Sequence, residues 1–383
     1  PRRCFAKGVQ EKPGPGIGSY EQVEQQLQSI GKYEQVLDNK STQIAVAKLK
    51  LHIEEGLCNK MNLHRVECPL IVDELRGVND MLDRDGSRTP VGFYIKNDHE
   101  KHPVNAQVVQ AATKWKRMAL AQFDCGLHEG VYTDMRAVRK DYFLDHDHSC
   151  YVAQWDWEMV IDEEDRNLDF LFDVVRRLYS VIKGAEQFIL DEYPDLKTCG
   201  VSELPDDIEF VHCQDLFDRW PDLDRKKRES MILEEKKAVF LCGIGYPMSD
   251  GTAHELRASD YDDWCTEAEW PMDGRTMRGL NGDILVWNQV TKRRHELSSM
   301  GIRVTKDTLK IQLKMSGQED FLNYPYHQAI LNDEIPLSIG GGIGQSRTFM
   351  YLLRKAHLGE IEISVWPQYF IDLCKKYNIN VLT

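Results

Sequence analysis

The stretch that decides the fold is Ile339-Gly340-Gly341-Gly342-Ile343-Gly344-Gln345-Ser346-Arg347, in which four glycines lead into a helix expected over residues 345–356. Glycine lets the backbone approach a ligand closely, and a helix N-terminus with an arginine in its first turn attracts phosphate. The run lacks the Gly-Lys-Ser/Thr of a P-loop and the last glycine of a dinucleotide-binding motif. Taken alone, it predicts either a phosphate-binding segment or a structural turn.

Upstream of the glycine run, residues 280–288 and 296–304 predict the two strands of a hairpin that turns near residues 289–290. A turn at that point places Asp283 opposite Glu296. Two carboxylates that face each other across neighbouring strands suit Mg²⁺, a hard ion that keeps several waters and bridges to phosphates. The alternative is a pair of solvated surface acids.

A second pair of strands is expected over residues 130–139 and 149–160, joined by a charged loop through Asp147. In the later strand, apolar and polar residues alternate with the period of two that is typical of a sheet. One face carries Tyr151, Ala153, Trp155 and Trp157, and the other carries Val152, Gln154, Asp156 and Glu158. A polar face normally points to water, but the two tryptophans beneath it favour a central strand and a polar pocket floor. Arg139 ends the first strand on that same side.

The remaining pattern places helices and strands along the chain. Helices are expected over residues 20–30, 42–57, 168–190 and 225–237, and a buried strand over residues 238–245. A strand over residues 64–72 is interrupted by Pro69, which has no N–H to donate, so it should lie at an edge or an interface. Strands joined by hairpins, with helices between them, predict an α+β fold with an antiparallel sheet rather than a doubly wound parallel sheet.

Composition narrows the class of protein. Of 383 residues, 42% are hydrophobic and 29% charged, which is typical of a soluble globular protein. A formal net charge of −14 leaves no basic excess for the phosphates of a nucleic acid, so no nucleic-acid partner is expected. No apolar run reaches the roughly 18 residues of a membrane span and no signal peptide is evident, so no membrane contact and a cytoplasmic location are expected. The ten cysteines lack zinc-ligand spacing and are expected to be reduced, mostly buried thiols.

Several runs together resemble the ammonia-dependent asparagine synthetases, the aspartate–ammonia ligases. These runs are residues 280–288, 296–304 and 340–347, with Lys114-Trp115-Lys116-Arg117, Gln154-Trp155-Asp156-Trp157-Glu158 and Asp260-Tyr261-Asp262-Asp263-Trp264. The resemblance extends from about Val66 to Pro367. It implies the α+β catalytic fold of class II aminoacyl-tRNA synthetases, an antiparallel sheet flanked by helices, assembled as a homodimer.

The resemblance also implies the three sequence motifs of the class II synthetase fold, in their expected order along the chain. Pro69 is similar to the dimer-interface motif, Arg139 with the strand after it resembles the second motif, and the glycine run with Arg347 resembles the third. Residues 1–19, rich in Gly, Pro, Lys and Arg, are expected to be a flexible lead-in, and residues 20–383 a single catalytic domain. The region up to about Leu63 is longer than in the short bacterial pattern, and residues 267–278 look like an insertion.

The activity that the resemblance implies is the amidation of L-aspartate by ammonia, with ATP converted to AMP and pyrophosphate through β-aspartyl-AMP. Arg139 is the candidate for the α-phosphate and the attacking carboxylate, and Arg347 for the distal phosphates. Gly344 belongs to the same ATP site, and Asp283 with Glu296 is the candidate pair for Mg²⁺.

The aspartate pocket and the ammonia site follow from the same resemblance. The residues that match the family's aspartate pocket are Lys116, Gln154, Asp156, Asp262, Ser298, Ser299, Arg303 and Gly340. Ammonia is mostly ammonium near neutral pH, so an acid is needed that binds the cation and accepts a proton. Asp80, in Gly77-Val78-Asn79-Asp80, is the first candidate for this acid, and Asp262 is the second.

Two other functions compete with this one. An aspartyl- or asparaginyl-tRNA synthetase shares the adenylation step but needs an anticodon-binding domain, and we expect no separate basic module before Tyr20 or after Thr383. A catalytically inactive relative that serves as a binding protein is disfavoured by the intact set Arg139, Asp283, Glu296 and Arg347. Glutamine is not the expected nitrogen donor, because the SGGxDS pyrophosphate loop of the glutamine-dependent synthetases is missing.

Overall fold

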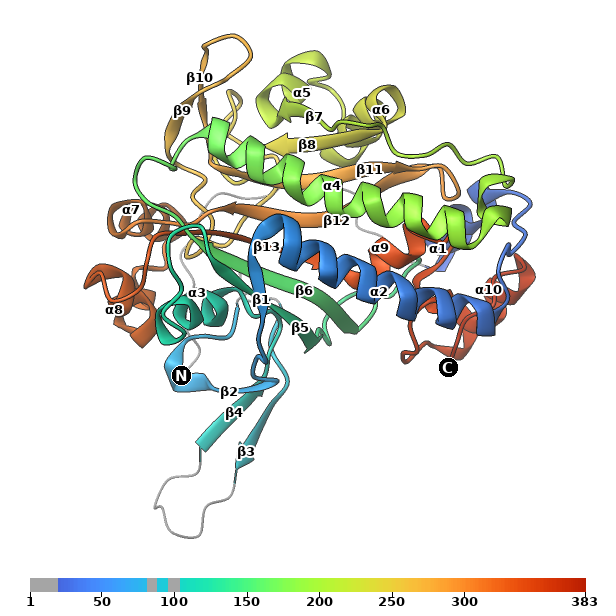
Figure 1. The fold of residues 1–383 in the computed structure, drawn as a ribbon, viewed down its shortest axis with the longest axis horizontal. Helices are drawn as coiled ribbons and strands as arrows, with labels where there is room; N and C mark the ends of the chain where they lie inside the picture. Colours follow the sequence, from blue (N-terminus) through green and yellow to red (C-terminus); the bar gives the residue numbers. More distant parts are fainter. Residues whose placement is uncertain (1–19, 81–87, 96–103) are drawn as a thin grey trace.

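Eight strands form the central sheet of the protein (Figure 1). The structure is a computed structural model and describes residues 20–80, 88–95 and 104–383. In spatial order the strands are β1 (Leu63–Arg65), β5 (Gly130–Val138), β6 (Tyr151–Val160), β13 (Ser338–Gly344), β12 (Arg293–Ile302), β11 (Asn281–Asn288), β8 (Ala238–Cys242) and β7 (Glu209–His212). The predicted lead-in, residues 1–19, lies outside the described residues.

The middle of this sheet is antiparallel, as the sequence predicted. Every pairing from β5 through β6, β13, β12 and β11 to β8 is antiparallel. The two outermost pairings, β1 with β5 and β7 with β8, are parallel. A parallel pairing needs a crossover connection, and long connections are what separate β1 from β5 and β7 from β8. The hairpin argument therefore holds for the centre of the sheet and fails at its edges.

Two long helices cover the apolar face of the sheet. α2 (Asn39–Met61) and α4 (Leu168–Glu192) lie side by side across it, in front of the strands in Figure 1. Trp155 and Trp157 of β6 are completely buried in this core. The period-two pattern of β6 is thus confirmed, with its apolar residues under the helices and its carboxylates on the opposite face.

The ends of α2 show what fixed its length. Asp38 caps the helix, because its side chain accepts a hydrogen bond from the N–H of Ser41 at 2.7 Å. At the other end Asn62 adopts a left-handed conformation with φ of 52°, which terminates the helix. The sequence predicted a shorter helix over residues 42–57, because the apolar spacing alone does not reveal either cap.

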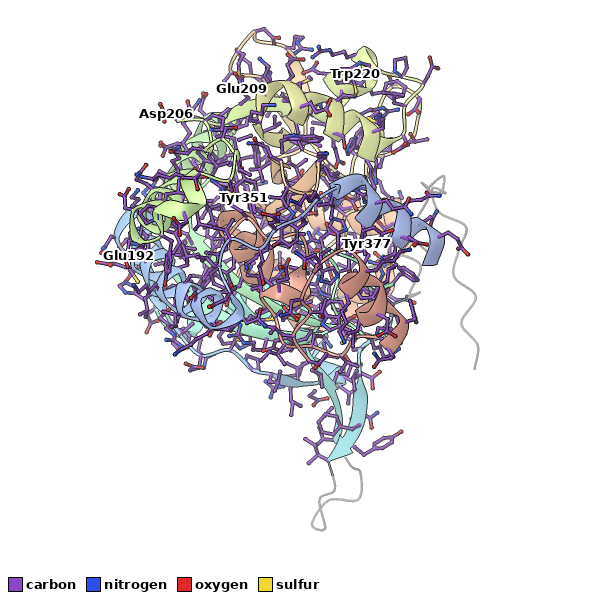
Figure 2. The ribbon with its side chains drawn as sticks, turned by 90° about the vertical axis from the view of Figure 1, so that its right-hand side faces the viewer. Glu192, Asp206, Glu209, Trp220, Tyr351 and Tyr377 are labelled. Carbon is purple, nitrogen blue, oxygen red and sulfur yellow. The ribbon has the colours of Figure 1, made fainter. Side chains whose placement is uncertain are left out.

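The other helices surround the sheet: α1 (Tyr20–Ile30), α3 (Thr113–Gln122), α5 (Cys213–Arg219), α6 (Arg225–Lys236), α7 (Lys306–Ser316), α8 (Pro325–Leu331), α9 (Gln345–Leu352) and α10 (Gln368–Lys376), with short 3₁₀ turns at Glu74–Arg76, Pro194–Lys197, Glu319–Asn323 and Leu358–Glu360. The last helix packs on the first, since Lys376 pairs with Glu24 at 2.6 Å. Tyr377, labelled in Figure 2, donates to the same carboxylate at 3.4 Å.

The single interrupted strand expected over residues 64–72 is wrong. The segment is divided between β1 in the central sheet and β2 (Ile71–Asp73) in a separate sheet with β4 (Val104–Val108) and β3 (Gly92–Ile95). Pro69 lies between β1 and β2, outside either strand. This second sheet projects from the main body as an arm (Figures 1 and 2).

Two smaller expectations have different outcomes. Residues 267–278, predicted as an insertion, form a small hairpin of β9 (Glu267–Glu269) and β10 (Thr276–Arg278). Of the nine described cysteines, all free thiols, only Cys213, Cys242, Cys265 and Cys374 are buried, so the expectation of mostly buried thiols is wrong. Within the described chain, no helix is long and apolar enough to cross a membrane.

Candidate active site

A cavity of about 360 Å³ lies on the polar face of the sheet. Most of its lining comes from β6, β12 and β13, the start of α3, the start of α9 and the segment 255–262, and the segment 139–149 and the start of α6 also contribute. The polar face of β6, which carries Gln154 and Asp156, is therefore a pocket floor rather than a surface turned to water.

The glycine run forms the central strand of this floor. Residues 338–344 are β13, paired with β6 on one side and β12 on the other, so the run is a strand and not a turn. A Cβ atom at Gly342 would lie 2.6 Å from Oδ1 of Asp156, so only glycine leaves room for that carboxylate. β13 leads directly into α9, which ends at Leu352 rather than at the expected residue 356.

At one end of the cavity, Lys116 and Asp156 are held rigidly. Nζ of Lys116 lies 3.3 Å from Oδ1 of Asp156 and donates to the carbonyl of Gly341 at 2.7 Å. Oδ2 of Asp156 accepts from the N–H of Ala112, at 3.0 Å, just before α3. Both charged side chains are buried, so their hydrogen bonds fix their positions.

Arg303 lies beside them at the end of β12. Its guanidinium forms ion pairs with Asp262 and with Glu158, the latter at 2.7 Å. Arg303 and Asp262 also line the cavity, whereas Glu158 lies behind Arg303 and does not. This end thus presents fixed positive and negative groups together, which is the arrangement that a small molecule with both charges requires.

Arg139 lies across the floor from these groups. It follows β5 directly and continues its pairing, because its N–H donates to the carbonyl of Cys150 at 2.8 Å. Its Nε donates to the carbonyl of Gln110 at 3.0 Å. The predicted hairpin of β5 and β6 is confirmed, and it places Arg139 on the same side of the sheet as Gln154.

Arg347 marks the other end of the cavity, in the first turn of α9. Its Nη1 lies 3.5 Å from Oε2 of Glu296, and its Nε donates to the carbonyl of Asp147 at 3.2 Å. Its Nη2 lies 3.3 Å from Nε2 of His148. These contacts leave Arg347 half-buried, at the rim of the cavity.

The predicted opposition of Asp283 and Glu296 is wrong. Asp283 pairs with Ser299, and Glu296 pairs with Leu285, because the hairpin turns over residues 289–292 and Leu297 forms a bulge. The bulge has a consequence for the site. Strict alternation would put Glu296 and Ser299 on opposite faces, but the extra residue turns both toward the cavity.

Asp283 and Glu296 nevertheless remain electrostatically linked through arginines. Arg257 forms an ion pair with Asp283 and covers it. Burial raises the pKa of Asp283 to about 7, with a further rise from Glu296 that Arg257 opposes. For Glu296, burial is outweighed by Arg347, Arg294 and Arg257, which lower its pKa. The two acids therefore lie on one face of β11 and β12, where Arg257 affects the pKa of both.

Asp80 is buried near the start of α3 and is not part of the cavity lining. Its Oδ2 accepts from the N–H of Thr113 at 2.9 Å, while its Oδ1 has no hydrogen-bond partner among the described residues. Burial raises the pKa of Asp80 to about 6, against the opposing effects of Lys114 and the Thr113 N–H. The carboxylate thus has one oxygen without a hydrogen-bond partner among the described residues, and its pKa is close to neutrality.

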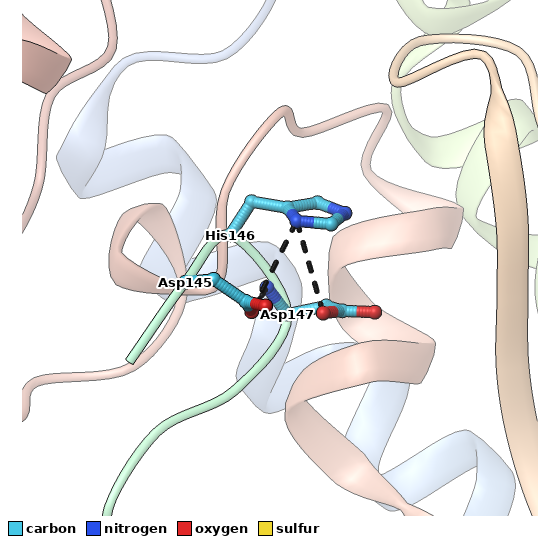
Figure 3. Close-up of side chains that lie close together, drawn as sticks. All are labelled: Asp145, His146 and Asp147. Carbon is cyan, nitrogen blue, oxygen red and sulfur yellow. Dashed lines mark hydrogen bonds and ion pairs between the residues drawn. The ribbon is translucent and has the colours of Figure 1, made fainter. Parts of the chain in front are cut away.

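A loop cluster supports the Arg347 end. Asp145, His146 and Asp147 place their ligand atoms within 4.8 Å of one another, and are the one such group with metal-ligand potential in the described parts of the chain (Figure 3). Nδ1 of His148 lies 2.8 Å from Asp145 and 2.9 Å from Asp147. Although burial lowers the pKa of His148, the two carboxylates raise it to about 9. A protonated histidine therefore already balances these acids.

The cavity collects most of the residues that the sequence singled out. Those that line it are Lys116, Arg139, Gln154, Asp156, Asp262, Glu296, Ser299, Arg303, Gly344 and Arg347. Those that the structure does not bring to the lining are Asp80, Asp283, Ser298 and Gly340.

The structure explains why three of these residues do not line the cavity. Ser298 pairs with Ile284 and Ile343, whose side chains belong to the main core, so its hydroxyl lies on the core face. Successive residues of a strand face opposite sides, so Ser298 and Ser299 cannot both reach the cavity. Asp283 is covered by Arg257, and Gly340 lies beneath Glu158.

Several lining residues were missed from the sequence. They are Arg225 and Lys226 at the start of α6, with Glu255, Arg257 and Tyr261. Tyr261 lies within one of the quoted runs, which could have revealed it. The run of Lys and Glu in α6 suggests only a solvated helix face, and residues 246–262 have no periodicity that would indicate which side chains point inward.

Comparison with known proteins identifies the family. The family model described as aspartate–ammonia ligase matches residues 40–378. The aspartate–ammonia ligases of Bacteroides fragilis and Clostridium perfringens are each 43% identical over 350 residues, which is 91% of this chain and 97% of theirs.

Solved structures with a similar fold are class II aminoacyl-tRNA synthetases, as the family resemblance implied. The asparaginyl-tRNA synthetase of Entamoeba histolytica, in complex with asparaginyl-adenylate, has a TM-score of 0.59 at 15% identity and covers 90% of this chain and 71% of its own. That of Pyrococcus horikoshii, also complexed with asparaginyl-adenylate, has a TM-score of 0.58 at 16% identity, with 91% and 74% covered. At these identities the likeness shows the fold, whereas the sequence match shows the family: this chain belongs to the aspartate–ammonia ligases.

Proposed function

We propose that this chain catalyses the ATP-dependent amidation of L-aspartate by ammonia, giving L-asparagine, AMP and pyrophosphate through β-aspartyl-AMP. The observation that carries the proposal is a single cavity with fixed charges of both signs at one end and arginines at the other. A carboxylate and ammonia do not condense in water, because the carboxylate is a poor electrophile. Conversion to an acyl adenylate makes it reactive, and the protein's part is to position the reactants and stabilise charge.

The residues divide between the two substrates. Lys116, Asp156 and Arg303 hold opposite charges in fixed positions, which suits the ammonium and carboxylate groups of aspartate; Gln154, Asp262 and Ser299 complete this pocket. Arg139, across the floor from Lys116 and Asp156, is assigned to the α-phosphate and the attacking carboxylate. Arg347 is assigned to the distal phosphates, and Gly344, which lines the cavity just before α9, is assigned to the same ATP site.

Mg²⁺ is the ion that would accompany ATP, and the donor set fits it. Asp283 and Glu296 supply hard carboxylate oxygens on one sheet face, and the negative charge of Glu296 disfavours ionisation of Asp283, which a cation between them would favour. These two residues would hold the ion, and the ion would neutralise part of the negative charge of the phosphates. Arg257, which pairs with Asp283, would then be released toward the phosphates.

Asp80 is assigned to ammonia. An ammonium ion next to a carboxylate can transfer a proton to it, which leaves the neutral amine that attacks the adenylate. The unpartnered Oδ1 and the raised pKa of Asp80 support this role, since both favour cation binding and proton acceptance. Asp262 is the alternative, but its carboxylate is engaged by Arg303.

Domain organisation and assembly are proposed on two further observations. The main core includes residues from Val23 to Ile379, which supports one catalytic domain over residues 20–383. The arm after Pro69 exposes apolar side chains, among them Ile71, Phe93, Tyr94 and Ile95, which supports its use as the interface of a homodimer. The cytoplasmic location stays a prediction from the sequence.

One assay tests the proposed function. The protein is incubated with ATP, aspartate, Mg²⁺ and either ammonium or glutamine, and AMP, pyrophosphate and asparagine are measured. Equimolar AMP and asparagine with ammonium, and none with glutamine, is the expected result. Formation of ADP and phosphate would contradict the adenylate mechanism. Attachment of aspartate or asparagine to added tRNA without an ammonia requirement would establish a tRNA synthetase instead.

A further inference from the structure

Glu158 is a buried carboxylate next to the cavity whose role neither the sequence motifs nor the assigned substrate contacts explain. It is completely buried on β6, opposite Gly340 of β13. Its Oε1 accepts from Nε of Arg303 at 2.9 Å and from the hydroxyl of Ser338 at 2.7 Å. Its Oε2 accepts from Nη2 of Arg303 at 2.7 Å. The carboxylate therefore grips one edge of the guanidinium with both oxygens.

These contacts determine what Arg303 presents to the cavity. A guanidinium has five N–H donors in a rigid plane. The Nε donor and one Nη2 donor are directed to Glu158, and one Nη1 donor is directed to Asp262. Nη1 and Nη2 each have a second N–H that accounts for no hydrogen bond to the described residues, and two N–H groups on one edge of a guanidinium form a fork that matches a carboxylate. Glu158 thus fixes the plane in which that fork lies.

Gly340 explains how the ion pair fits under the floor. A Cβ atom at this position would lie 1.9 Å from Oε2 of Glu158 and 2.6 Å from Nη2 of Arg303. Both separations are far below van der Waals contact, so any side chain at residue 340 would displace the carboxylate or the guanidinium. Gly340 does not line the cavity, and its contribution is to leave room for the pair.

We propose that Glu158 is a positioning residue for aspartate: it holds Arg303 in the orientation in which the free fork binds a substrate carboxylate, and Gly340 is needed for that arrangement. This inference rests on the proposed function, in which Arg303 contacts aspartate. Glu158 does not line the cavity and lies away from the nucleotide end, so its substitution should affect the binding of aspartate and not that of ATP.

The first test is Glu158→Gln, with Ser338→Ala as a milder variant that removes only the hydroxyl donor. Without the carboxylate charge, Arg303 is drawn toward Asp262 and its fork turns away from the substrate. We expect the KM for aspartate to rise by roughly ten- to a hundredfold in Glu158→Gln and by about two- to fivefold in Ser338→Ala. The KM for ATP should stay within about twofold in both, since a positioning effect on one substrate leaves the other unchanged.

The second test is a double-mutant cycle. Gly340→Ala alone should raise the KM for aspartate because it displaces Glu158, and Glu158→Ala should do the same by removing it. The loss in the double variant should be smaller than the two single losses combined, because the closest clash of the methyl group, with Oε2 of Glu158, is gone, although its approach to Nη2 of Arg303 stays. Melting temperatures of all variants establish that each is folded.

Opposite results would overturn the proposal. An unchanged KM for aspartate in Glu158→Gln, equal losses for aspartate and ATP, or additive losses in the cycle each contradict a positioning role. The wild-type protein is assayed in parallel for asparagine and AMP. Its inactivity would overturn the proposed function itself, whereas an active wild type with an unaffected Glu158→Gln would overturn only the role of Glu158.

Discussion

The two ends of the cavity are built in different ways. At the aspartate end, the side chain of Arg303 is 2% exposed and is held by Glu158 and Asp262, and Lys116 is equally enclosed. At the nucleotide end, Arg347 and its partner Glu296 are 22% and 27% exposed, with 3.5 Å between their charged atoms. One end is a closed ion-pair network, and the other is a looser set of charges open to the cavity.

The difference agrees with the substrate proposed for each end. Aspartate is small and is recognised by the placement of a few charges, so rigid groups whose hydrogen bonds are already made lose little freedom on binding. ATP brings several negative charges and Mg²⁺, so arginines that are paired to acids before binding must exchange those partners. Substitutions at the closed end should therefore be specific to aspartate and costly to the fold, whereas those at the open end should act mainly on ATP.

The largest effect is expected at Arg139, which is assigned to both the aspartate carboxylate and the α-phosphate of ATP. Arg139→Ala removes the positive charge assigned to the α-phosphate and the attacking carboxylate, so charge that develops during adenylation is left unbalanced. Aspartate-dependent exchange of pyrophosphate into ATP should fall by roughly 10²–10³-fold or more. The measurement is isotope exchange without ammonia. Exchange at the wild-type rate would show that Arg139 is not part of the adenylation site.

A matched pair of substitutions compares the two ends directly. Arg303→Lys and Arg347→Lys each keep the charge but lose the fork. In Arg303→Lys the KM for aspartate should rise by about a hundredfold, and the melting temperature should drop, because Glu158 and Asp262 stay buried with fewer hydrogen bonds. In Arg347→Lys the KM for ATP should rise by about tenfold, with little change in melting temperature. Similar profiles in the two variants would mean that the ends do not differ as described.

Substitution of Asp80, the residue assigned to ammonia, should distinguish adenylation from amidation. Asp80→Asn should retain pyrophosphate exchange and reduce asparagine formation by roughly 10²-fold, because the amide cannot accept a proton from ammonium. In the assigned role the carboxylate form of Asp80 is the active one, and the pKa of Asp80 is raised to about 6. At a constant concentration of ammonium, the amidation rate of the wild type should therefore increase as pH rises through about 6 and level off above it. A rate set by free ammonia alone would instead keep rising with pH.

Loss of both half-reactions in Asp80→Asn would instead make Asp80 a structural or aspartate-binding residue. The control is Asp262→Asn, at the alternative position. Since Asp262 engages Arg303, this variant should impair exchange as well as amidation. A variant at Asp262 that loses only amidation would transfer the ammonia role to it.

The sequence predicted some parts of both ends and could not predict others. The alternation in β6 and the hairpin strands are local patterns, so the pocket floor and the positions of Arg139 and Arg347 followed from them. The bulge at Leu297 did not, because a bulge depends on hydrogen bonds between strands that no spacing in one strand reveals. The pairing of Arg257 with Asp283 also escaped detection, because it joins a loop without periodicity to a strand. Similarly, a proline in an apolar run could not show that β1 and β2 enter different sheets.

Stability at the open end should depend on pH through His148. Its pKa in the folded protein is raised to about 9 by Asp147 and Asp145 despite its burial, above the 6.5 of an ordinary histidine. The folded state therefore binds the proton more tightly, and this contribution is fully present below about pH 6.5 and lost as pH rises through about 9. His148→Gln should lower the free energy of unfolding by roughly 1–3 kcal/mol at pH 6 and much less at pH 10.

Thermal unfolding of the two proteins between pH 6 and 10 provides the measurement. His128→Gln is the control, since His128 also contacts a carboxylate, that of Asp165 at 2.8 Å, but is 48% exposed. An exposed pair contributes little, so its substitution should leave the pH dependence of stability nearly unchanged. A constant difference between wild type and His148→Gln at every pH would contradict the assigned protonation.

The smallest expected effect distinguishes two neighbours on β12 that the sequence could not separate. Ser299 lines the cavity, so Ser299→Ala should raise the KM for aspartate by about two- to fivefold through the loss of one hydrogen bond. Ser298 lies on the core face, where its hydroxyl has no hydrogen-bond partner among the described residues. Removing a buried hydroxyl without a partner costs nothing, so Ser298→Ala should leave both KM values unchanged and keep or raise the melting temperature. The reverse result, with aspartate binding sensitive to Ser298 and not to Ser299, would require the register of β12 beyond the bulge to shift by one residue, which would also turn Arg303 away from the closed end.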